Sequence, residues 1–428
     1  MIVRASINVV FAAAVLACGT EESATRAPAS APSAEPPAAA APPAVSEPEA
    51  YPQGIVLALA QFVTKDGKPV PGPARLEFLT REGGEWKVAV LEDPESNVFH
   101  KAMVYEGGDA PVLLTLAGTG AAVKTWRPGD DGLIPSTEWE QDFGGRFSRM
   151  RDAEVADLFG DGGASIAVAT HDQGVVAVLR PEGAGFAVTE IDRKPDTFVH
   201  EIEIGDVDGD GVLEVYATPS EPNRLDGSPQ TGEVVRYVPA RGEGPTVVAD
   251  LGDRHAKEIL VEDIDGDGRD ELYVSVEGHM ENKQLVDPVE IRRYEADTPP
   301  DAGEVIATLD DRLGRFLTAG DVDGDGSKEL VAALFKRGIW LLRPGADGGT
   351  WDLEQIDADS GGFEHAALLT DLDGDGKDEL YVASDDDKEV RRYRWSDGRS
   401  ARDTIYVRPD DRPVFTWNLM PVPVELVP

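Results

Sequence analysis

The chain has 428 residues, with 81 Asp and Glu against 40 Lys and Arg, and its formal net charge is −41. A phosphate backbone is bound by clustered Lys and Arg, so this charge balance excludes nucleic acid as a partner. Hydrophobic residues make up 41% of the chain, which is ample for a sizeable core at this length and excludes disorder throughout.

The first element in chain order is an apolar segment that ends at Cys18, the single cysteine of the chain. A lone cysteine excludes an intramolecular disulfide and a cysteine zinc site. Residues 1–17 contain one basic residue, Arg4, followed by a nearly continuous apolar run. The run is too short to span a bilayer and has the order of a secretory signal. Val15 to Cys18 resembles a bacterial lipobox, in which the cysteine is diacylated; an ordinary signal peptide is the alternative.

The lipobox resemblance implies a signal peptide over residues 1–17 and lipidation of Cys18. Gly19 stands where an inner-membrane retention Asp is common, so the resemblance implies the outer membrane or cell surface of a Gram-negative-type bacterium. Residues 19–52 contain 11 Ala and 8 Pro, and such a segment cannot bury enough surface to fold. We therefore expect residues 18–52 to form a linker between a membrane anchor and a monomeric domain over residues 53–428.

A repeated acidic segment organises the rest of the chain. DVDGDGVLEVYAT and three close copies begin at Asp206, Asp263, Asp321 and Asp371, and a degenerate copy, DLFGDGGASIAVA, begins at Asp157. The five starts are 49, 57, 58 and 50 residues apart. This period fits one four-stranded propeller blade, and short apolar runs bounded by Gly, Pro and Asp are typical of its strands.

The apolar strands on either side of these segments count to seven. One series precedes the acidic segments, from VFHKAMV at Val98 to VFTWNLM at Val414, and a second series ends in acidic residues. The C-terminal strand lacks partners after it, and three N-terminal strands lack a first strand before them. The sequence therefore predicts an all-β, seven-bladed propeller with four-stranded blades, closed by joining both ends in one blade. A sandwich or an open repeat array is the alternative.

The acidic segments are predicted to bind about four Ca²⁺ ions. Their alternating Asp residues, a backbone carbonyl and a following Glu supply the hard oxygen ligands that Ca²⁺ prefers. An EF-hand is disfavoured because position 12 is apolar and strands follow, and a metal-free acidic turn remains the alternative. The predicted ligands are Asp206, Asp208, Asp210, Val212, Glu214, Asp263, Asp265, Asp267, Arg269, Glu271, Asp321, Asp323, Asp325, Ser327, Glu329, Asp371, Asp373, Asp375, Lys377 and Glu379.

The four segments and their strand context resemble the FG-GAP or VCBS repeats of bacterial surface proteins. That resemblance implies the seven-bladed propeller of the integrin α-subunit type. The Asp157 segment has Phe159 and Ser165 at ligand positions, and the segment at Glu106 is shorter. We expect no tight Ca²⁺ site in either.

A second pattern lies six residues before each segment start. Cationic or titratable residues occupy this position, and we expect them to surround the mouth of the central channel opposite the Ca²⁺ segments. Pairing with acids such as Asp192, Asp253, Asp311 and Asp359 is the alternative to a free ligand-binding ring. The possible ligand-binding residues are His100, Arg151, His200, Lys257, Arg315 and His365.

The sequence favours a binding protein over an enzyme. It contains no nucleophile elbow, phosphate-binding glycine loop or HExxH pair. The first hypothesis is a calcium-binding propeller lipoprotein that binds a protein or glycan in an adhesion role through its loop-rich face. The alternative is a lyase or hydrolase that acts on anionic polysaccharide in the central funnel, which rests on analogy with other propellers.

Overall fold

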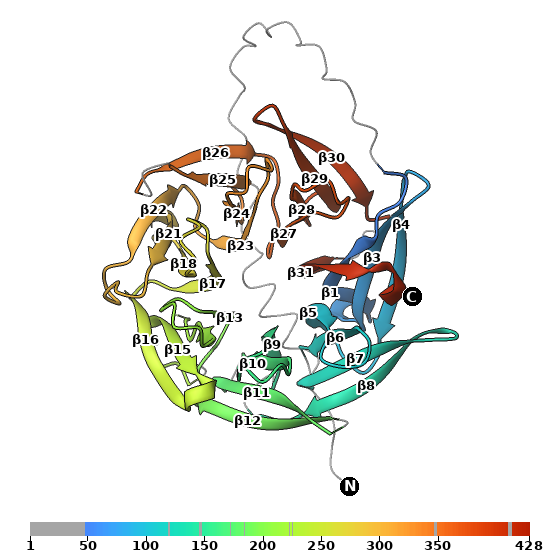
Figure 1. Cartoon of the computed structure of the whole chain (residues 1–428), viewed down its shortest axis with the longest axis horizontal. Coiled ribbons are helices and arrows are strands. Elements are labelled where there is room, and N and C mark those ends of the chain that lie inside the picture. The colour runs from blue at the N-terminus through green and yellow to red at the C-terminus, as the bar shows by residue number, and fades with distance from the viewer. Residues whose placement is uncertain are drawn as a thin grey trace, which may run out of the picture.

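Seven antiparallel sheets stand around a central axis as the blades of a propeller (Figure 1). The computed structural model describes residues 48–428, apart from 119, 145–147, 172, 184, 222, 225, 346–348 and 410–412. The expected signal segment, Cys18 and residues 18–47 of the linker lie outside the described residues. The prediction of an all-β, seven-bladed propeller is confirmed.

Six blades are contiguous in sequence, and each runs from an innermost to an outermost strand. Blades 1 to 3 contain β5 (Phe99–Tyr105), β6 (Val112–Ala117), β7 (Ala122–Gly129) and β8 (Gly132–Glu140); β9 (Met150–Ala156), β10 (Ser165–Thr170), β11 (Val175–Glu182) and β12 (Gly185–Arg193); and β13 (Ile202–Gly205), β14 (Glu214–Ala217), β15 (Gly232–Val238) and β16 (Glu243–Gly252). Blades 4 to 6 contain β17 (Ala256–Glu262), β18 (Glu271–Val276), β21 (Val289–Tyr294) and β22 (Glu304–Leu309); β23 (Gly314–Gly320), β24 (Glu329–Leu334), β25 (Ile339–Pro344) and β26 (Trp351–Asp357); and β27 (Ala367–Thr370), β28 (Glu379–Ser384), β29 (Glu389–Ser396) and β30 (Arg399–Val407).

The seventh blade joins the two ends of the described chain. Its innermost strand is β31 (Val414–Pro423), which pairs with β1 (Gln53–Lys65), and β3 (Ala74–Glu82) and β4 (Glu85–Asp93) complete it. We call it the closing blade. The innermost strands of neighbouring blades contact one another all the way round, from β31 through β5 to β27. The ring therefore closes as the sequence predicts.

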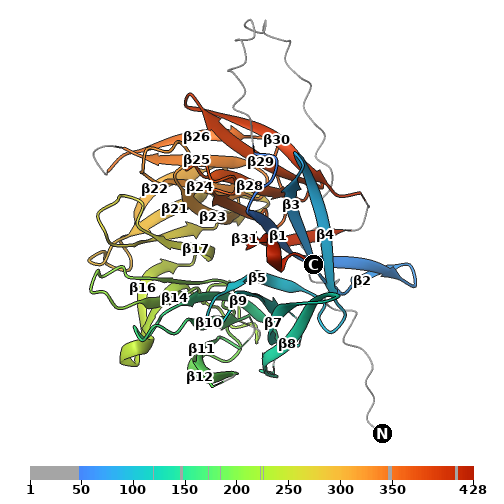
Figure 2. The same ribbon diagram turned by 45° about the vertical axis from the view of Figure 1, so that its right-hand side comes forward.

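Some elements were not expected from the sequence. A short strand, β2 (Lys68–Pro71), extends the N-terminal strand as a hairpin that projects from the ring (Figure 2). In blade 4, the connection between β18 and β21 contains a hairpin of β19 (His279–Glu281) and β20 (Gln284–Asp287). The two 3₁₀ helices are η1 (Pro239–Arg241) and η2 (Val424–Leu426).

The hydrophobic core lies between blades as seven clusters, one at each blade interface. In β10, Ile166 and Val168 face blade 1, whereas Ala167 and Ala169 face blade 3. Successive side chains of a strand point to opposite faces, so a strand between two neighbours buries both sets. This explains why the second strand of each blade is a continuous apolar run rather than an alternating one.

Candidate functional site

Four acidic loops connect the innermost strand to the second strand in blades 3 to 6. Because the blades share one strand direction, all four loops lie at the same end of the propeller. We call them the Asp loops; they are residues 206–214, 263–271, 321–329 and 371–379.

The backbone of each Asp loop is a tight turn fixed by its first aspartate. In the first loop, the Asp206 carboxylate accepts hydrogen bonds from the backbone N–H groups of Asp210 and Gly211, at 3.0 and 2.8 Å. Gly209 and Gly211 have φ values of 67° and 82°, which side-chain-bearing residues rarely adopt. The second residue, Val207, is buried and anchors the turn. The sequence repeat thus specifies a conformation as well as a set of ligands.

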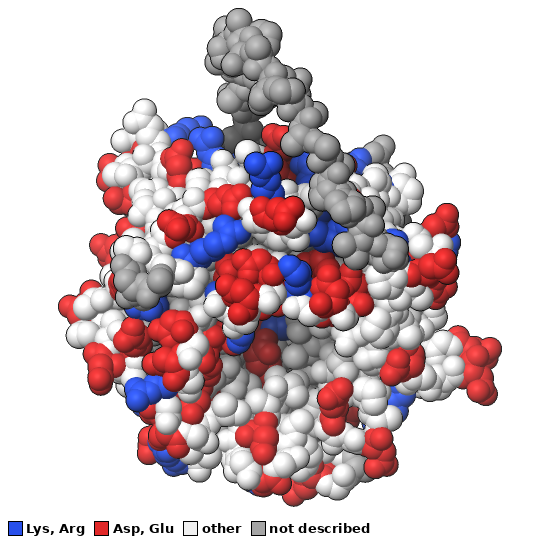
Figure 3. Space-filling model, turned by 45° about the horizontal axis from the view of Figure 1, so that its top comes forward, with Lys and Arg blue, Asp and Glu red and all other residues white. Residues whose placement is uncertain are grey.

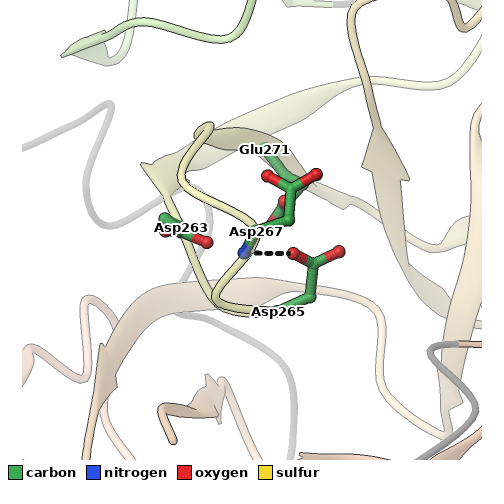
Figure 4. A group of neighbouring side chains, drawn as sticks. All are labelled: Asp263, Asp265, Asp267 and Glu271. Carbon is green, nitrogen blue, oxygen red and sulfur yellow. Dashed lines mark hydrogen bonds between the residues drawn. The ribbon is translucent and has the colours of Figure 1, made fainter. Parts of the chain in front are cut away.

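The carboxylates of the Asp loops converge. Ligand oxygens of Asp263, Asp265, Asp267 and Glu271 all lie within 4.8 Å of one another (Figure 4). In the other three loops, three carboxylates meet the same limit: Asp206, Asp208 and Asp210; Asp321, Asp323 and Asp325; and Asp371, Asp373 and Glu379. Donor sets of carboxylate oxygens fit Ca²⁺ in their chemistry.

The four residues predicted to offer a carbonyl ligand follow the third aspartate of each loop. Their backbone N–H groups donate to that aspartate at 2.8–3.0 Å, which holds the turn closed. These residues are Val212, Arg269, Ser327 and Lys377. Their role as carbonyl ligands stays a prediction.

The last glutamate of each Asp loop is buried at the start of the second strand. Burial raises the pKa of Glu271 and Glu329 to about 7 and that of Glu379 to about 8. Tyr273 donates a hydrogen bond to Glu271 at 2.9 Å, and Tyr381 donates one to Glu379 at 3.1 Å. These glutamates are costly to ionise without a nearby positive charge, and a cation in the loop would supply it.

Arginines already occupy part of the first Asp loop. The Arg236 guanidinium lies 2.7 Å from Glu214 and 3.3 Å from Asp208, and Arg241 bonds Asp210. In the second loop, the nearest such contact is longer, with Arg293 lying 3.7 Å from Asp265. The four loops therefore share a turn but differ in how much of their charge is already compensated.

Neighbouring Asp loops are linked in pairs. The Asp270 carboxylate accepts the backbone N–H of Asp206 from the adjacent blade at 2.7 Å, and Asp378 accepts that of Asp321 at 2.8 Å. Each contact ties the eighth residue of one loop to the first residue of the loop before it. Each of these hydrogen bonds therefore joins two Asp loops across a blade interface.

The degenerate segment at Asp157 keeps the turn and loses ligands. Asp157 caps the backbone N–H groups of Asp161 and Gly162 at 3.0 and 2.7 Å, as Asp206 does in its own loop. Arg180 pairs with Asp161, and its guanidinium lies 4.4 Å from the centre of the Phe159 ring. An internal cation thus stands at this loop, where we predict no tight Ca²⁺ site.

The opposite end of the propeller carries the six residues predicted to surround the channel. In five innermost strands, one residue has no partner on the second strand, and the pairing register shifts there. At each of these bulges, two consecutive side chains turn toward the channel. The unpaired residues are His100, Arg151, Lys257, Arg315 and Trp417. The other two predicted residues, His200 and His365, lie two residues before the first residues of β13 and β27, and neither lines the channel cavity. We call the complete set the mouth ring: His100, Arg151, His200, Lys257, Arg315, His365 and Trp417.

Two cations of the mouth ring, Lys257 and Arg315, are paired with glutamates, whereas the Arg151 guanidinium lies 4.8 Å from the centre of the Trp417 ring. Glu221 lies 3.0 Å from His200 and 3.1 Å from Lys257. Arg315 bonds Glu364 and lies 3.7 Å from Glu277. These glutamates, rather than the strand-end aspartates considered from the sequence, neutralise the ring; Asp192, for example, accepts a hydrogen bond from Tyr237 at 2.7 Å.

The ring histidines are neutral. Burial lowers the pKa of His200 to about 3 and that of His365 to about 4, and it also lowers the pKa of His100. His365 is fully buried between the hydroxyl of Ser360 at 2.7 Å and the carbonyl of Leu334 at 2.6 Å. Bases this weak are poorly suited to proton abstraction at neutral pH.

The channel behind the mouth ring has a volume of about 140 Å³. Four cations line it, namely Lys101, Arg151, Lys257 and Arg315, against six acids: Asp152, Glu154, Glu201, Glu203, Glu258 and Glu364. The channel is therefore acidic rather than basic. Figure 3 shows that acidic side chains are also spread over the outer surface, around a hollow in the face that it presents.

Aromatic rings and buried polar atoms without a hydrogen bond gather at the same end. Phe363 lies 5.3 Å from Phe415 and 6.4 Å from Phe335, ring centre to ring centre, and all three are partly exposed. Within the described part of the chain, His100 Nε2 and Trp417 Nε1 are buried atoms that lack a hydrogen-bond partner. Such atoms are rare in folded proteins and call for an explanation.

Sequence reasoning missed the channel acids and Trp417. Asp152, Glu201 and Glu258 each stand one residue after a mouth-ring residue, and Trp417 aligns with the ring in the C-terminal strand. The charged residues in the predicted innermost strands could have indicated these channel acids. The register shifts that turn two consecutive side chains inward were not predictable from the spacing.

Fold and loops together define a seven-bladed β-propeller, and part of it matches an FG-GAP-like repeat. Residues 321–382 match the family model described as FG-GAP-like repeat, and this range contains the third and fourth Asp loops up to β28. None of the curated proteins compared with the chain matches it. No helix within the described residues is both long and apolar enough to cross a bilayer.

Several solved structures are similar in fold. A putative 6-phosphogluconolactonase from Bacteroides uniformis has 12% identity and a TM-score of 0.52 over 87% of this chain and 100% of its own. One from Bacteroides fragilis has 14% identity and a TM-score of 0.51 over 89% and 100%. A lectin from Agrocybe aegerita that recognises terminal N-acetylglucosamine has 16% identity and a TM-score of 0.49 over 84% and 91%. Identities this low show the fold alone.

Proposed function

We propose that this protein is a calcium-binding recognition module that binds a glycan at the mouth ring. The observation that carries the proposal is that Trp417, a partly exposed ring, lines one cavity together with His100, and both side chains hold a buried nitrogen without a hydrogen-bond partner. Phe363 lies next to this cavity, 5.1 Å from the guanidinium of the lining residue Arg315. Ligand sites are typically concave, with aromatic walls and a few fixed polar groups. Sugar rings offer apolar faces to aromatic side chains and hydroxyl groups to atoms such as His100 Nε2 and Trp417 Nε1.

The enzymatic alternative has less support. A lyase or hydrolase for anionic polysaccharide needs unpaired cations and a base of suitable strength. Lys257 and Arg315 are paired with glutamates, and the acids that line the channel outnumber its cations. The low pKa of His200 and His365 makes both weak bases.

Calcium is proposed as a structural component of the opposite end. Each ion would join the carboxylates that converge in one Asp loop and would offset their mutual repulsion. The links through Asp270 and Asp378 would extend this effect between blades.

We further propose that the propeller is displayed on a membrane by a lipid on Cys18. The apolar segment before Cys18 and the Ala/Pro-rich linker after it support this arrangement. Incorporation of labelled fatty acid in the native type of host, followed by membrane fractionation, tests it. The C18A variant should incorporate no label and leave the membrane fraction.

A binding screen with Ca²⁺ present tests the recognition proposal. Labelled protein is applied to a glycan array and to surface proteins, and binding is then measured for Trp417→Ala and Phe363→Ala. Both variants should lose a glycan ligand, because each removes a ring beside the cavity. Phe159→Ala is the matched control, since Phe159 is a partly exposed ring at the other end of the propeller. Binding that Phe159→Ala abolishes and the other two retain would contradict the proposal.

A further inference from the structure

The channel beneath the mouth ring is lined by more acidic side chains than cations. Three of its four cations belong to the mouth ring, so Lys101 is the cation of the interior. Five acids from three neighbouring innermost strands line this interior: Asp152 and Glu154 of β9, Glu201 and Glu203 at β13, and Glu258 of β17. Packing these carboxylates around one ammonium group is costly, because like charges repel strongly in a desolvated site.

Lys101 shows how this channel holds a positive charge. Its ammonium group lies 3.0 Å from Asp152 and also bonds Glu154, so one ammonium bridges two carboxylates from the next blade. Lys101 is itself buried, and its pKa stays well above the ordinary value because of these acids. A primary ammonium group is therefore a form of cation that this site accommodates.

The other three acids lack such a partner. Within the described residues, no Lys or Arg nitrogen lies within ion-pair distance of Glu201, Glu203 or Glu258; Glu258 accepts the backbone N–H of Leu317 at 3.0 Å. A second observation points to a ligand in the same cavity. Asn418 lines the channel with 6% of its surface exposed, and its Oδ1 atom has no hydrogen-bond partner. An unpaired buried acceptor and unpaired acids together call for a donor that carries positive charge.

The geometry favours an ammonium group over a divalent metal. The groups of three or more acids that converge within 4.8 Å in the described structure are the Asp loops, at the other end of the propeller. The channel acids do not converge on one point, so a ligand with two ammonium groups joined by a short chain suits them better than a single ion. A cavity of about 140 Å³ admits a short aliphatic chain.

We propose that the central channel binds a small aliphatic diamine, whose protonated amino groups are shared among Glu201, Glu203, Glu258 and Asn418. This inference is independent of the proposed glycan recognition, because it concerns the interior of the channel and not the rings at its mouth. It assigns a role to acids that neither the Ca²⁺ loops nor the mouth ring uses.

Binding should be coupled to proton release. Burial and neighbouring acids raise the pKa of Glu201 and Glu203, and burial raises that of Glu258 to about 8. An arriving ammonium group favours the ionised carboxylates, so protons leave as it binds. The other charged or titratable groups that face this cluster are His100 and Lys101 from β5, Arg151, Asp152 and Glu154 from β9, Lys257 from β17, Arg315 from β23 and Glu364 before β27.

Calorimetric titration of the full chain with putrescine at neutral pH tests the proposal. Saturating Ca²⁺ is present, so that the Asp loops are not available to the amine. We expect saturable binding at one site, with protons released to the buffer. Glu203→Gln should weaken binding about tenfold, the usual effect of losing one charge-assisted hydrogen bond. Glu140→Gln, which alters an exposed acid on β8, should leave the affinity unchanged.

Several results would overturn the proposal. These are the absence of saturable heat with putrescine, an affinity that neither Glu203→Gln nor Glu258→Gln changes from that of the unmodified protein, or binding of uncharged butanediol as tight as that of putrescine. Both glutamine variants keep the shape of the side chain, and melting curves check that they fold. If either variant fails to fold, Asn418→Ala replaces it and should also weaken binding. A glycan that still binds while putrescine does not would separate this inference from the proposed function.

Discussion

The two ends of this propeller both gather carboxylates, yet they do so in opposite ways. At the Asp-loop end, the aspartates are exposed or half-buried on turns that repeat from blade to blade. At the mouth-ring end, Asp152 and Glu258 are buried in strands, and their identity changes with each blade. The repeated sequence at the Asp-loop end suits a structural role. The residues that vary between blades at the mouth-ring end suit the recognition of a ligand. Lys101 supplies a cation from the chain itself at one end, whereas at the other end we propose that Ca²⁺ from solution supplies it.

Removal of calcium should have the largest effect on stability. This effect should arise at the Asp-loop end of the propeller. Each ion stabilises the folded state by about 2.7 kcal/mol when its concentration is a hundredfold above Kd. Four ions would therefore contribute roughly 10 kcal/mol. A chelator should lower the melting temperature strongly, and mass spectrometry should count about four ions before chelation. An unchanged melting curve together with no bound metal would contradict the calcium proposal.

Breaking an ion pair of the mouth ring should have the next largest effect. Arg315→Ala leaves Glu364 and Glu277 buried without their guanidinium partner. Removing one member of a buried pair typically costs about 3–5 kcal/mol. Chemical denaturation with Ca²⁺ present measures the loss, and the number of bound ions should stay the same. Lys328→Ala is a control, because it removes an ion pair with Glu262 whose side chains are 41% and 35% exposed. If both variants lost a similar amount of unfolding free energy, the buried ion pair would contribute no more to stability than the exposed one.

The channel acids should also make the free energy of unfolding depend on pH. The folded-state pKa of Glu258 is raised to about 8, so its stabilising proton is fully present at acidic pH and is lost as the pH rises through 8. His200 and His365 act in the opposite direction, but their lowered pKa values confine that effect to below about pH 6.5. Above that pH, the free energy of unfolding should therefore fall, by roughly 1–2 kcal/mol between pH 6.5 and 8.5.

Glu258→Gln sharpens this test. The amide keeps an acceptor for the Leu317 N–H and removes the titration, so the slope of stability against pH should flatten. Saturating Ca²⁺ keeps the glutamates of the Asp loops out of the measurement. A slope that Glu258→Gln leaves unaltered would place the effect elsewhere in the molecule.

The same contrast explains what could be predicted from the sequence. The turn of each Asp loop depends on local spacing, since Asp206, Gly209 and Gly211 act within six residues, so the repeat predicts it directly. The blade count followed because every blade repeats the pattern. The partners of the mouth ring could not be found this way: Arg315 and Glu364 are 49 residues apart and meet across a blade interface. The extra residues in the innermost strands depend on pairing register, which sequence spacing does not reveal.

The smallest effect should come from the degenerate loop, and it tests whether the turn can exist without metal. Asp157→Ala removes two caps, to the backbone N–H groups of Asp161 and Gly162. We expect a loss of about 1–2 kcal/mol, the usual range for a lost cap, with the number of bound Ca²⁺ ions unchanged. Asp263→Ala, at the same position of an intact loop, should lose similar caps and also one ion, so its melting temperature should depend more on chelator. If both variants lost an ion, the Asp157 loop would be a fifth metal site; if neither did, capping rather than ligation would be the function of the first aspartate. If only Asp263→Ala lost an ion, Arg180 would take the place in blade 2 that a metal ion has in blades 3 to 6.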